Sequence, residues 1–351
     1  MEFTLGETQQ AVRDLAAEVL ARETERSAAS TGIGFDESVW KALGEAGLLS
    51  LPVPEELGGA GLGPLEVGLV LAEIGRAGVA VPALATLAFG VLPIARHGSP
   101  AQQRELFAEP GRVFSAALNE VSNPLPAKPA ATLRDSRVTG RKVGVLHADT
   151  AHRLLVSVGT DADPAIALVD PHADGVTLHS VKSSAGTEWV VDLDGVAAET
   201  LGEAGESVLD DVHACALAGM CALGDGAVAG ALELTSEHLR TREQFGKPLA
   251  AFQAVAQQIA DVYVVNRTLH LAALSASWRL STGRDAGEDL DVAAFWLTDQ
   301  APAAMHTCHH LHGGLGVDIT YPMHRYYSQV KDLARLAGGA AHRVDVLARH
   351  A

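Results

Sequence analysis

The chain has 351 residues, 48% of them hydrophobic and 20% charged, a composition ordinary for a globular protein of two or three domains. Its formal net charge of −17 argues against nucleic acid or an anionic membrane as a partner, because both would repel an acidic surface. Cys215, Cys221 and Cys308 show no CxxC spacing and no even-numbered framework, which favours a reducing, cytoplasmic setting.

The first predicted domain, residues 1–111, is helical. Its opening MEFTLGETQQ is polar and acidic, so no signal peptide is expected. TQQAVRDLAAEVLARE then places Val12, Leu15 and Val19 on one helix face. The most apolar run, 67–95, is broken by charges and prolines into pieces shorter than the roughly 20 residues of a membrane span, so no such span is predicted.

The second predicted domain, residues 112–211, is built of strands. RVFSAALN, RVTGRKVGVLHA, RLLVSVG, AIALVD, GVTLHSV and EWVVDLDGV are short, rich in Val and Leu, and separated by Gly, Asp, Asn and Pro. Short strands with turn signals at this spacing predict an antiparallel barrel or sandwich.

The third predicted domain, residues 212–351, returns to helices. FQAVAQQIADVYVV carries Phe252, Val255, Ile259 and Val262 at steps of three and four. Long apolar-striped helices joined by short loops predict a bundle, so the chain runs helices, strands, helices.

The segment RTREQFGKPLAAFQAVAQQIAD, residues 240–261, carries the strongest motif. A purely structural interpretation is a helix–turn–helix with Gly246 as the C-cap and Pro248 at the start of the next helix. That turn alone does not need the side chains around it, which are Arg242, Gln244, Phe245 and Gln253. An arginine can hold a pyrophosphate by two hydrogen bonds, a phenylalanine can stack on a planar ring, and glutamines can bond a ribityl or adenine edge.

This segment resembles the acyl-CoA dehydrogenase family, whose C-terminal helical domain carries an R-x-Q-F-G-x-x-[LI]-x-x-[FHY]-Q corner. REQFGKPLAAFQ matches it completely. HLHGGLGVDITYPMHR is similar to the family's Q-x-x-G-G-x-G stretch followed by Y-P-x-x-R, with His310 at the usual glutamine position. Gly313 and Gly314 could form an ordinary helix C-cap, but together with the first motif they favour contact with a cofactor.

The resemblance extends over nearly the whole chain. WKALGEAGLLSLPVPEELGGAGLG is similar to the family's N-terminal domain, and VTGRKVGVLHADTAHRLLVSV is similar to its central strand pair. It implies an α+β, mainly helical acyl-CoA dehydrogenase fold: an N-terminal helical domain, a central β-domain and a C-terminal four-helix bundle. It also implies FAD as the cofactor, contacted on its adenine side, in a neighbouring subunit, by Arg242, Gln244, Phe245, Gln253, His310, Gly313 and Gly314.

The catalytic glutamate that the resemblance would imply is missing. The family's Y-E-G-T turn aligns with Leu336–Gly339, which puts Ala337 at the position of the base. Some members carry the glutamate on the first bundle helix instead, and counting back from Arg242 leads there to Ala216. Asp225 and Glu233 lie further along that helix and are expected to be solvated or inter-helix residues. No residue is predicted to act as the base.

The family's T-E-P-x-A-G-S-D stretch, which docks the flavin ring and the thioester, is also largely absent. The chain has LNEVSNPLPAKPA there, and only Asn119–Glu120 resembles the T-E pair. The resemblance therefore implies that this chain contacts a neighbour's FAD and lacks most of the site for its own.

Histidines gather beside the second motif. His306, His309 and His310 share a helix face by their spacing, with Cys308 and His312 close by. Such spacing can bind zinc. Because no fourth ligand and no HExxH motif accompany it, no metal site is predicted.

Three interpretations remain. The favoured one resembles the short subunits of actinobacterial α2β2 enzymes that desaturate steroid side-chain CoA thioesters. A homologous acyl-CoA dehydrogenase subunit would then complete a heterotetramer, with a bulky acyl-CoA as substrate and an electron-transfer flavoprotein as electron acceptor. The alternatives are a homo-oligomeric acyl-CoA dehydrogenase with a relocated base, and a structural pseudoenzyme that binds no FAD.

Overall fold

The computed structural model describes residues 3–27 and 35–349. The chain divides into two compact units. The strand unit comprises Glu25–Val67 and Ala80–Gly219, and the helical unit comprises Met1–Thr24, Gly68–Val79 and Met220–Ala351. Helices α3 (Pro64–Ala77) and α6 (Glu206–Thr241) contribute residues to both units.

One mixed sheet dominates the strand unit. Its strands are β1 (Phe114–Ala117), β2 (Thr132–Arg134), β3 (Arg137–Leu146), β4 (Arg153–Gly159), β5 (Pro164–Val169), β6 (Val176–Lys182), β7 (Thr187–Ala197) and β8 (Glu199–Thr200). They follow the order β6-β7-β3-β2-β4-β5-β8, with β1 added beside β4. The predicted β-domain is confirmed, but its pairing is not wholly antiparallel, because β1 and β2 run parallel to β4.

Buried valine and leucine side chains form the core of this sheet. In β4 the central residues are all buried, and β7 alternates between buried and more exposed positions. The shared core includes Val138, Leu154, Val156, Val191 and Val196. Inward-facing side chains from neighbouring strands therefore pack together in one apolar core.

Short helices complete the strand unit. They are α2 (Glu37–Glu45), the 3-10 turn η1 (Glu55–Leu57), the π-helix η2 (Leu84–Val91), α4 (Leu92–His97) and α5 (Pro100–Leu106). Asp36 caps α2 by accepting hydrogen bonds from the amides of Ser38 and Val39. Ser99 and Gln102 form a reciprocal capping box at the start of α5.

A buried ion pair fixes the loop that follows β1. Lys142 is fully buried, and its Nζ donates to Glu120 Oε1 at 2.7 Å and to Ser157 Oγ at 2.9 Å. Glu120 also accepts the backbone amides of Ala130 and Ala131. Burial lowers the pKa of Lys142 to about 8, partly offset by the carboxylate. Burial alone would raise the pKa of Glu120, but the Lys142 and amide hydrogen bonds together bring it below its ordinary value.

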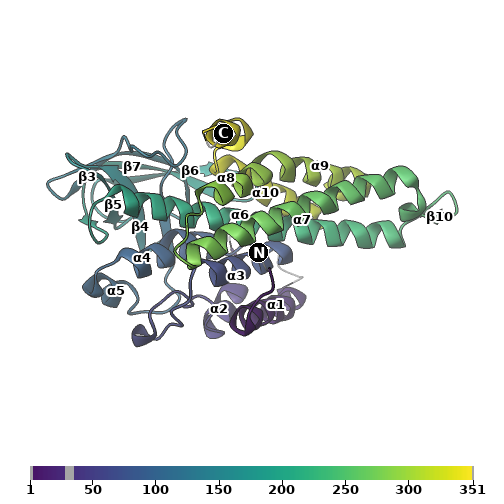
Figure 1. The fold of residues 1–351 in the computed structure, drawn as a ribbon, viewed down its shortest axis with the longest axis horizontal. Helices are drawn as coiled ribbons and strands as arrows, with labels where there is room; N and C mark the ends of the chain where they lie inside the picture. Colours follow the sequence, from purple (N-terminus) through teal and green to yellow (C-terminus); the bar gives the residue numbers. More distant parts are fainter. Residues whose placement is uncertain (1–2, 28–34, 350–351) are drawn as a thin grey trace. The chain divides into compact units, whose positions relative to one another are not determined.

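The helical unit is built around α6 and α7 (Gln253–Ser281). Its other elements are α1 (Glu7–Ser27), β9 (Glu243–Gln244), β10 (Lys247–Pro248), η3 (Leu249–Ala251), α8 (Gly287–Phe295), the π-helix η4 (Trp296–Gln300), α9 (Ala301–His312), η5 (Gly313–Val317), α10 (Met323–Leu336) and α11 (Gly339–Leu347). Figure 1 shows α6 and α7 extending together to the hairpin of β9 and β10.

Close backbone approach joins α3 to α6. A Cβ on Gly75 would meet the carbonyl oxygen of Leu223 at 2.1 Å, and one on Gly226 would meet the carbonyl oxygen of Ala72 at 1.8 Å. Only glycine fits at these crossings, so the two helices lie nearer than larger side chains would permit. Asp225, also on α6, accepts a 2.8 Å hydrogen bond from Nδ1 of His270 and so links α6 to α7.

Helix α6 is also the one helix among the described residues that is long and apolar enough to cross a membrane. Of its most apolar window, 89% is buried inside the protein, a pattern shared by core helices. The three cysteines are free and buried, and burial raises the pKa of Cys308 to about 11.

The predicted apolar stripe of α7 is buried only from Val262 onward. Val262 is 1% exposed, whereas Phe252, Val255 and Ile259 are only half-buried and Tyr263 is 59% exposed. No residue in the first nine of α7 is buried. The domain boundaries at 111 and 211 remain predictions; the helix expected from 212 begins at Glu206.

Glu120→Gln is expected to lower the free energy of unfolding by about 3–5 kcal/mol, because it leaves the Lys142 ammonium buried without a counter-charge. Adding Lys142→Met to that variant should recover most of the loss, since no buried charge then remains. Asp192→Asn is the matched control: its partner Arg141 is 60% exposed, so the loss should stay below about 1 kcal/mol. Urea unfolding measures all three variants. Equal losses for Glu120→Gln and Asp192→Asn would contradict the conclusion that Lys142 needs Glu120 as its buried counter-charge.

Candidate cofactor-contact site

The first motif forms a β-hairpin rather than a helix–turn–helix. Between α6 and α7, Gln244 pairs with Lys247, and the two residues between them have positive φ, +53° at Phe245 and +77° at Gly246. Two positive φ values suit the tightest hairpin turn. Gly246 is thus a hairpin residue, not a helix C-cap, and Pro248 precedes a 3-10 turn while α7 begins at Gln253.

Phe245 stands at the tip of this hairpin, 92% exposed. Its ring meets the edge of Phe252 at 6.3 Å, and Lys247 Nζ lies 4.2 Å from the centre of the Phe252 ring. A left-handed backbone costs a non-glycine residue about 1–2 kcal/mol. A large apolar ring held in that conformation and pointed at solvent offers a flat surface for another ring.

Arg242 lies at the base of the hairpin with its backbone fixed and its side chain exposed. Its amide donates to the carbonyl of His238, and its carbonyl accepts from the amide of Leu249, both at 2.9 Å. Within residues 3–27 and 35–349, the guanidinium donates no hydrogen bond and forms no ion pair. Gln253 is exposed at the first position of α7, and Gln244 donates to the carbonyl of Glu243.

The second motif is the sharp turn between α9 and η5. Gly313 has φ +56° and ψ −134°, a conformation essentially limited to glycine. Gly313 and Gly314 are exposed, and a Cβ added to either would meet nothing within 4 Å. The two glycines therefore present open backbone, and His310 is exposed on the last turn of α9 just before them.

A histidine pair brings the two motifs together. His238, four residues before Arg242, stacks on His312, directly before Gly313, with ring centres 4.6 Å apart and an interplanar angle of 23°. The predicted contact residues thus lie at one end of the helical unit, on the hairpin and on the adjoining glycine turn. No group of three or more His, Cys, Asp or Glu side chains in the described part of the chain is placed to hold a metal ion.

The turn aligned with the family's base lies between α10 and α11. Ala337 is fully buried, and Gly338 and Gly339 have φ of +101° and +78°. The buried Arg343 donates from Nε to the carbonyl of Ala337 at 2.6 Å, and its Nη1 lies 3.5 Å from Asp291 Oδ1. The backbone turn is therefore held firmly, and no side chain at its apex can accept a proton.

The acids along α6 are paired. Asp211 binds Arg96 and His97 in the strand unit. In the helical unit, Asp225 binds His270, and Glu233 forms an ion pair with Arg76. Burial raises the pKa of Asp225, opposed by its hydrogen bond with His270. These are inter-element contacts, as expected for Asp225 and Glu233, and the buried Ala216 adds no acid.

The loop that replaces the flavin-docking stretch folds inward on itself. Glu120 is only 8% exposed and is committed to Lys142 and two amides. Asn119 Oδ1 accepts the amide of Leu125, and Ser122 and Leu125 both have positive φ. The side-chain oxygens of Glu120 and Asn119 Oδ1 therefore accept their hydrogen bonds from groups within the strand unit.

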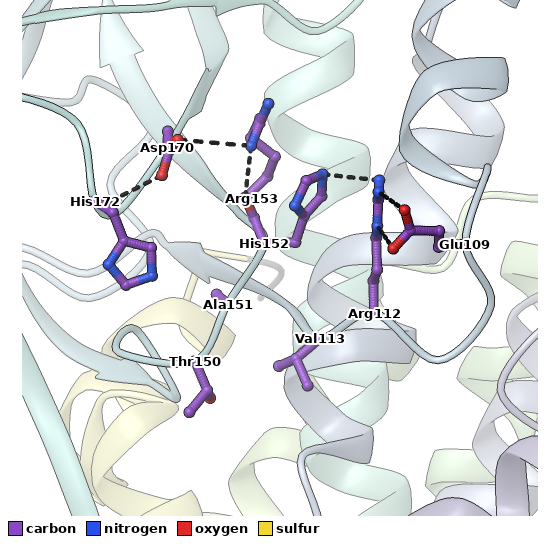
Figure 2. Close-up of a pocket in the computed structure, with 9 residues that line it drawn as sticks. All are labelled: Glu109, Arg112, Val113, Thr150, Ala151, His152, Arg153, Asp170 and His172. Atoms are coloured by element: carbon purple, nitrogen blue, oxygen red, sulfur yellow. Dashed lines mark hydrogen bonds and ion pairs between the residues drawn. The ribbon is translucent and has the colours of Figure 1, made fainter.

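A separate cleft of about 470 Å³ lies in the strand unit (Figure 2). Arg112 forms an ion pair with Glu109 at 2.9 Å and contacts Nε2 of His152 at 3.0 Å. A guanidinium only donates, so that nitrogen accepts and the His152 ring is neutral. Burial and the neighbouring Arg153 and Arg112 lower the pKa of His152 accordingly. The cleft balances its own charges, and none of the predicted contact residues lines it.

Comparison with known proteins identifies the family. Residues 6–109 match the N-terminal domain of acyl-CoA dehydrogenase, and residues 216–351 match its C-terminal domain. The chain belongs to the acyl-CoA dehydrogenase family.

Individual members of the family are similar to this chain over nearly their whole length. The chain is 46% identical to acyl-CoA dehydrogenase FadE28 of Mycobacterium tuberculosis (strain ATCC 25618 / H37Rv), over 99% of this chain and 98% of that protein. Among solved structures it is similar to a Tcur3481-Tcur3483 steroid ACAD G363A variant, with 33% identity, TM-score 0.90 and coverage of 99% and 98%. It is also similar to the ChsE4-ChsE5 complex from Mycobacterium tuberculosis, with 30% identity, TM-score 0.90 and coverage of 100% and 98%. FAD complexes share this fold at 20% identity, a likeness that concerns the fold alone.

Sequence reasoning missed several residues that shape the site. His238 carried no motif, although a histidine four residues before an exposed arginine was a signal that could have drawn attention. His312 was considered only as a metal ligand. Arg343 gave no signal, because its contact with the turn depends on how α11 packs.

Phe245→Gly is expected to leave the free energy of unfolding within about 1 kcal/mol of the wild type, because it relieves the positive φ and removes no buried contact. Gly246→Ala, one residue away, should lower it by about 1–2 kcal/mol, since alanine is strained at φ +77°. Thermal unfolding measures both. A large loss for Phe245→Gly would mean that the ring supports the fold.

Proposed function

We propose that this chain is the non-catalytic subunit of a heteromeric acyl-CoA dehydrogenase, contacting FAD held by a partner that supplies the catalytic glutamate. One observation carries the proposal. Arg242, Phe245 and the glycine turn are exposed together at one end of the helical unit, while the turn that would present the base holds a buried alanine.

The exposed groups suit the adenine side of FAD. Arg242 offers a guanidinium that forms no ion pair with any described residue and is fit for two hydrogen bonds to a pyrophosphate. Phe245 offers a ring for stacking, and Gln244 and Gln253 offer amides. Gly313 and Gly314 offer backbone with no side chain in the way. When bound, FAD would accept a hydride from the acyl-CoA; this chain's residues would hold its dinucleotide end.

Exposed apolar side chains in the helical unit support a partner. Phe245, Tyr263, Val264, Val317 and Ile319 are between 55% and 92% exposed. Several large apolar side chains exposed in one unit are typical of a subunit that associates. We infer that a homologous subunit covers them.

The solved relatives favour a heteromer and a steroid substrate. They are a ChsE4-ChsE5 complex and a Tcur3481-Tcur3483 steroid ACAD. By this likeness we propose a bulky acyl-CoA substrate. From the family resemblance we propose an electron-transfer flavoprotein as the electron acceptor and the cytoplasm as the setting.

The first test is the visible absorbance of the protein expressed alone and with a homologous, glutamate-bearing subunit encoded beside it. A flavin band should appear only in the complex, and Arg242→Ala should lower FAD affinity there about 10- to 100-fold, the worth of one charge-assisted contact. Arg240→Ala is the control, since Arg240 is exposed nearby and pairs with Glu237.

Stoichiometric flavin and turnover from the chain alone would favour a homo-oligomeric enzyme with a relocated base. Absence of flavin from the complex would favour a structural pseudoenzyme.

Ala337→Glu should give this chain no dehydrogenase activity when expressed alone, because restoring the carboxylate does not restore the flavin-docking stretch. It should also lower stability, since the position is fully buried and an unpaired carboxylate there is costly. Acyl-CoA-dependent reduction of a dye measures the first effect and urea unfolding the second. Turnover by the variant alone would show that the loop of Glu120 still accommodates flavin.

A further inference from the structure

The stacked pair His238 and His312 joins the hairpin to the glycine turn, and its chemistry restricts its charge. His312 is 5% exposed, and its Nδ1 lies 2.8 Å from the carbonyl oxygen of Cys308. A carbonyl only accepts, so Nδ1 carries the hydrogen. The other nitrogen, Nε2, is buried and has no hydrogen-bond partner among the described residues.

A proton on Nε2 of His312 would therefore be a buried cationic N–H with no acceptor. The ring of His238 lies against one side at 4.6 Å, and the Tyr321 ring centre lies 5.2 Å away. Burial and the backbone carbonyl act in opposite directions, and with His238 the outcome is a lowered pKa for His312. Burial and the charge of Arg242 lower the pKa of His238 in the same sense.

The surrounding ionisable groups give no relief. From α6 comes His238, and from the hairpin base directly after α6 comes Arg242, both potential cations. From α9 and α10 come His309, His306 and His324, which act on one another so that the pKa of His309 is also lowered, first by burial. No carboxylate is among the groups that shift the pKa of these histidines. A first proton on the stack thus meets only neutral or positive neighbours.

We propose that His238 and His312 are positioning residues: a neutral imidazole stack that holds the hairpin and the glycine turn at the spacing needed to grip FAD, and that opens on protonation. The inference rests on the proposed function and adds a pH dependence to it. Neither ring is a catalytic residue; each acts through the segment that follows it, Arg242 in one case and Gly313 in the other.

The sign of the effect follows from the lowered pKa values. With the stack closed, each histidine takes up its proton at a lower pH than in an open state, where the ordinary value is 6.5. As pH falls below 6.5 the open state binds more protons, so the closed stack is progressively lost. One such histidine can change the closed-to-open ratio by at most about tenfold at pH 5.5.

The experiment measures FAD affinity of the heteromeric complex from pH 7.5 to 5.5 by the fluorescence of released flavin. The wild type should lose affinity as the pH falls, by at most about tenfold for each of the two histidines. His312→Phe keeps an aromatic ring that cannot titrate, so it should hold FAD at pH 7.5 as the wild type does and lose at most about half as much on a logarithmic scale. His238→Phe provides the same test from the other ring if His312→Phe does not fold.

His306→Gln is the matched control, because His306 is exposed on the same helix and outside the stack; it should keep the full acid sensitivity. A second readout needs no flavin: amide hydrogen exchange in 306–325, corrected for intrinsic rate, should accelerate at pH 5.5 in the wild type and clearly less in His312→Phe.

Identical pH profiles for wild type and His312→Phe would overturn the inference, as would loss of FAD by both phenylalanine variants already at pH 7.5. Failure of the proposed function looks different: Arg242→Ala would then leave flavin content unchanged at every pH.

Discussion

The structure depends on how far α7 is buried against its own chain. Leu269 and Val262 are inside, and the hydrogen bond from His270 to Asp225 fixes this part of α7 to α6. Before Val262 the apolar stripe continues without a buried residue. Burial of apolar surface contributes roughly 25 cal/mol per Å², so a half-exposed stripe leaves stabilisation available to an association. The hairpin and the glycine turn belong to the same end of the unit, so the proposed cofactor contact and the proposed association would involve one region of the molecule.

Two buried cationic groups, one ammonium and one guanidinium, bind polar groups inside the protein. Lys142 holds Glu120, and Arg343 holds the carbonyl of Ala337. A buried charge that loses its partner is strongly destabilising, so Glu120 is not free to turn toward a ligand. Arg242 differs in kind: it is exposed, costs nothing to leave unpaired in water, and is available to an anion.

Much of the fold could be predicted from the sequence, because periodicity and motifs are local signals. The order of helices and strands follows from periodicity, and the corner at Arg242 and the turn at Gly313 follow from the resemblance to family motifs. The parallel pairing of β1 with β4 could not, since it depends on which distant strand lies alongside. The hairpin at Phe245 was missed for a different reason: glycine and proline suggested a helix cap, and nothing local indicates that a phenylalanine takes a positive φ. The stack of His238 on His312 joins residues far apart in sequence and needs the packing of α6 and α9.

The turn at Ala337 and the hairpin at Phe245 differ in how far packing within this chain explains them. The turn at Ala337 is accounted for by packing: two glycines at positive φ reverse the chain, Arg343 caps the carbonyl, and the apex residue is buried. These contacts hold the turn without any carboxylate at its apex, so the presence of the turn says nothing about catalysis. The hairpin is not accounted for in this way. Phe245 is strained and 92% exposed, and its ring adds little to the stability of the chain that carries it. An exposed aromatic ring at this position suits contact with a bound molecule, and the neighbouring arginine and bare glycine backbone suit a dinucleotide. The hairpin, more than the turn without a base, therefore points to a subunit that binds a cofactor.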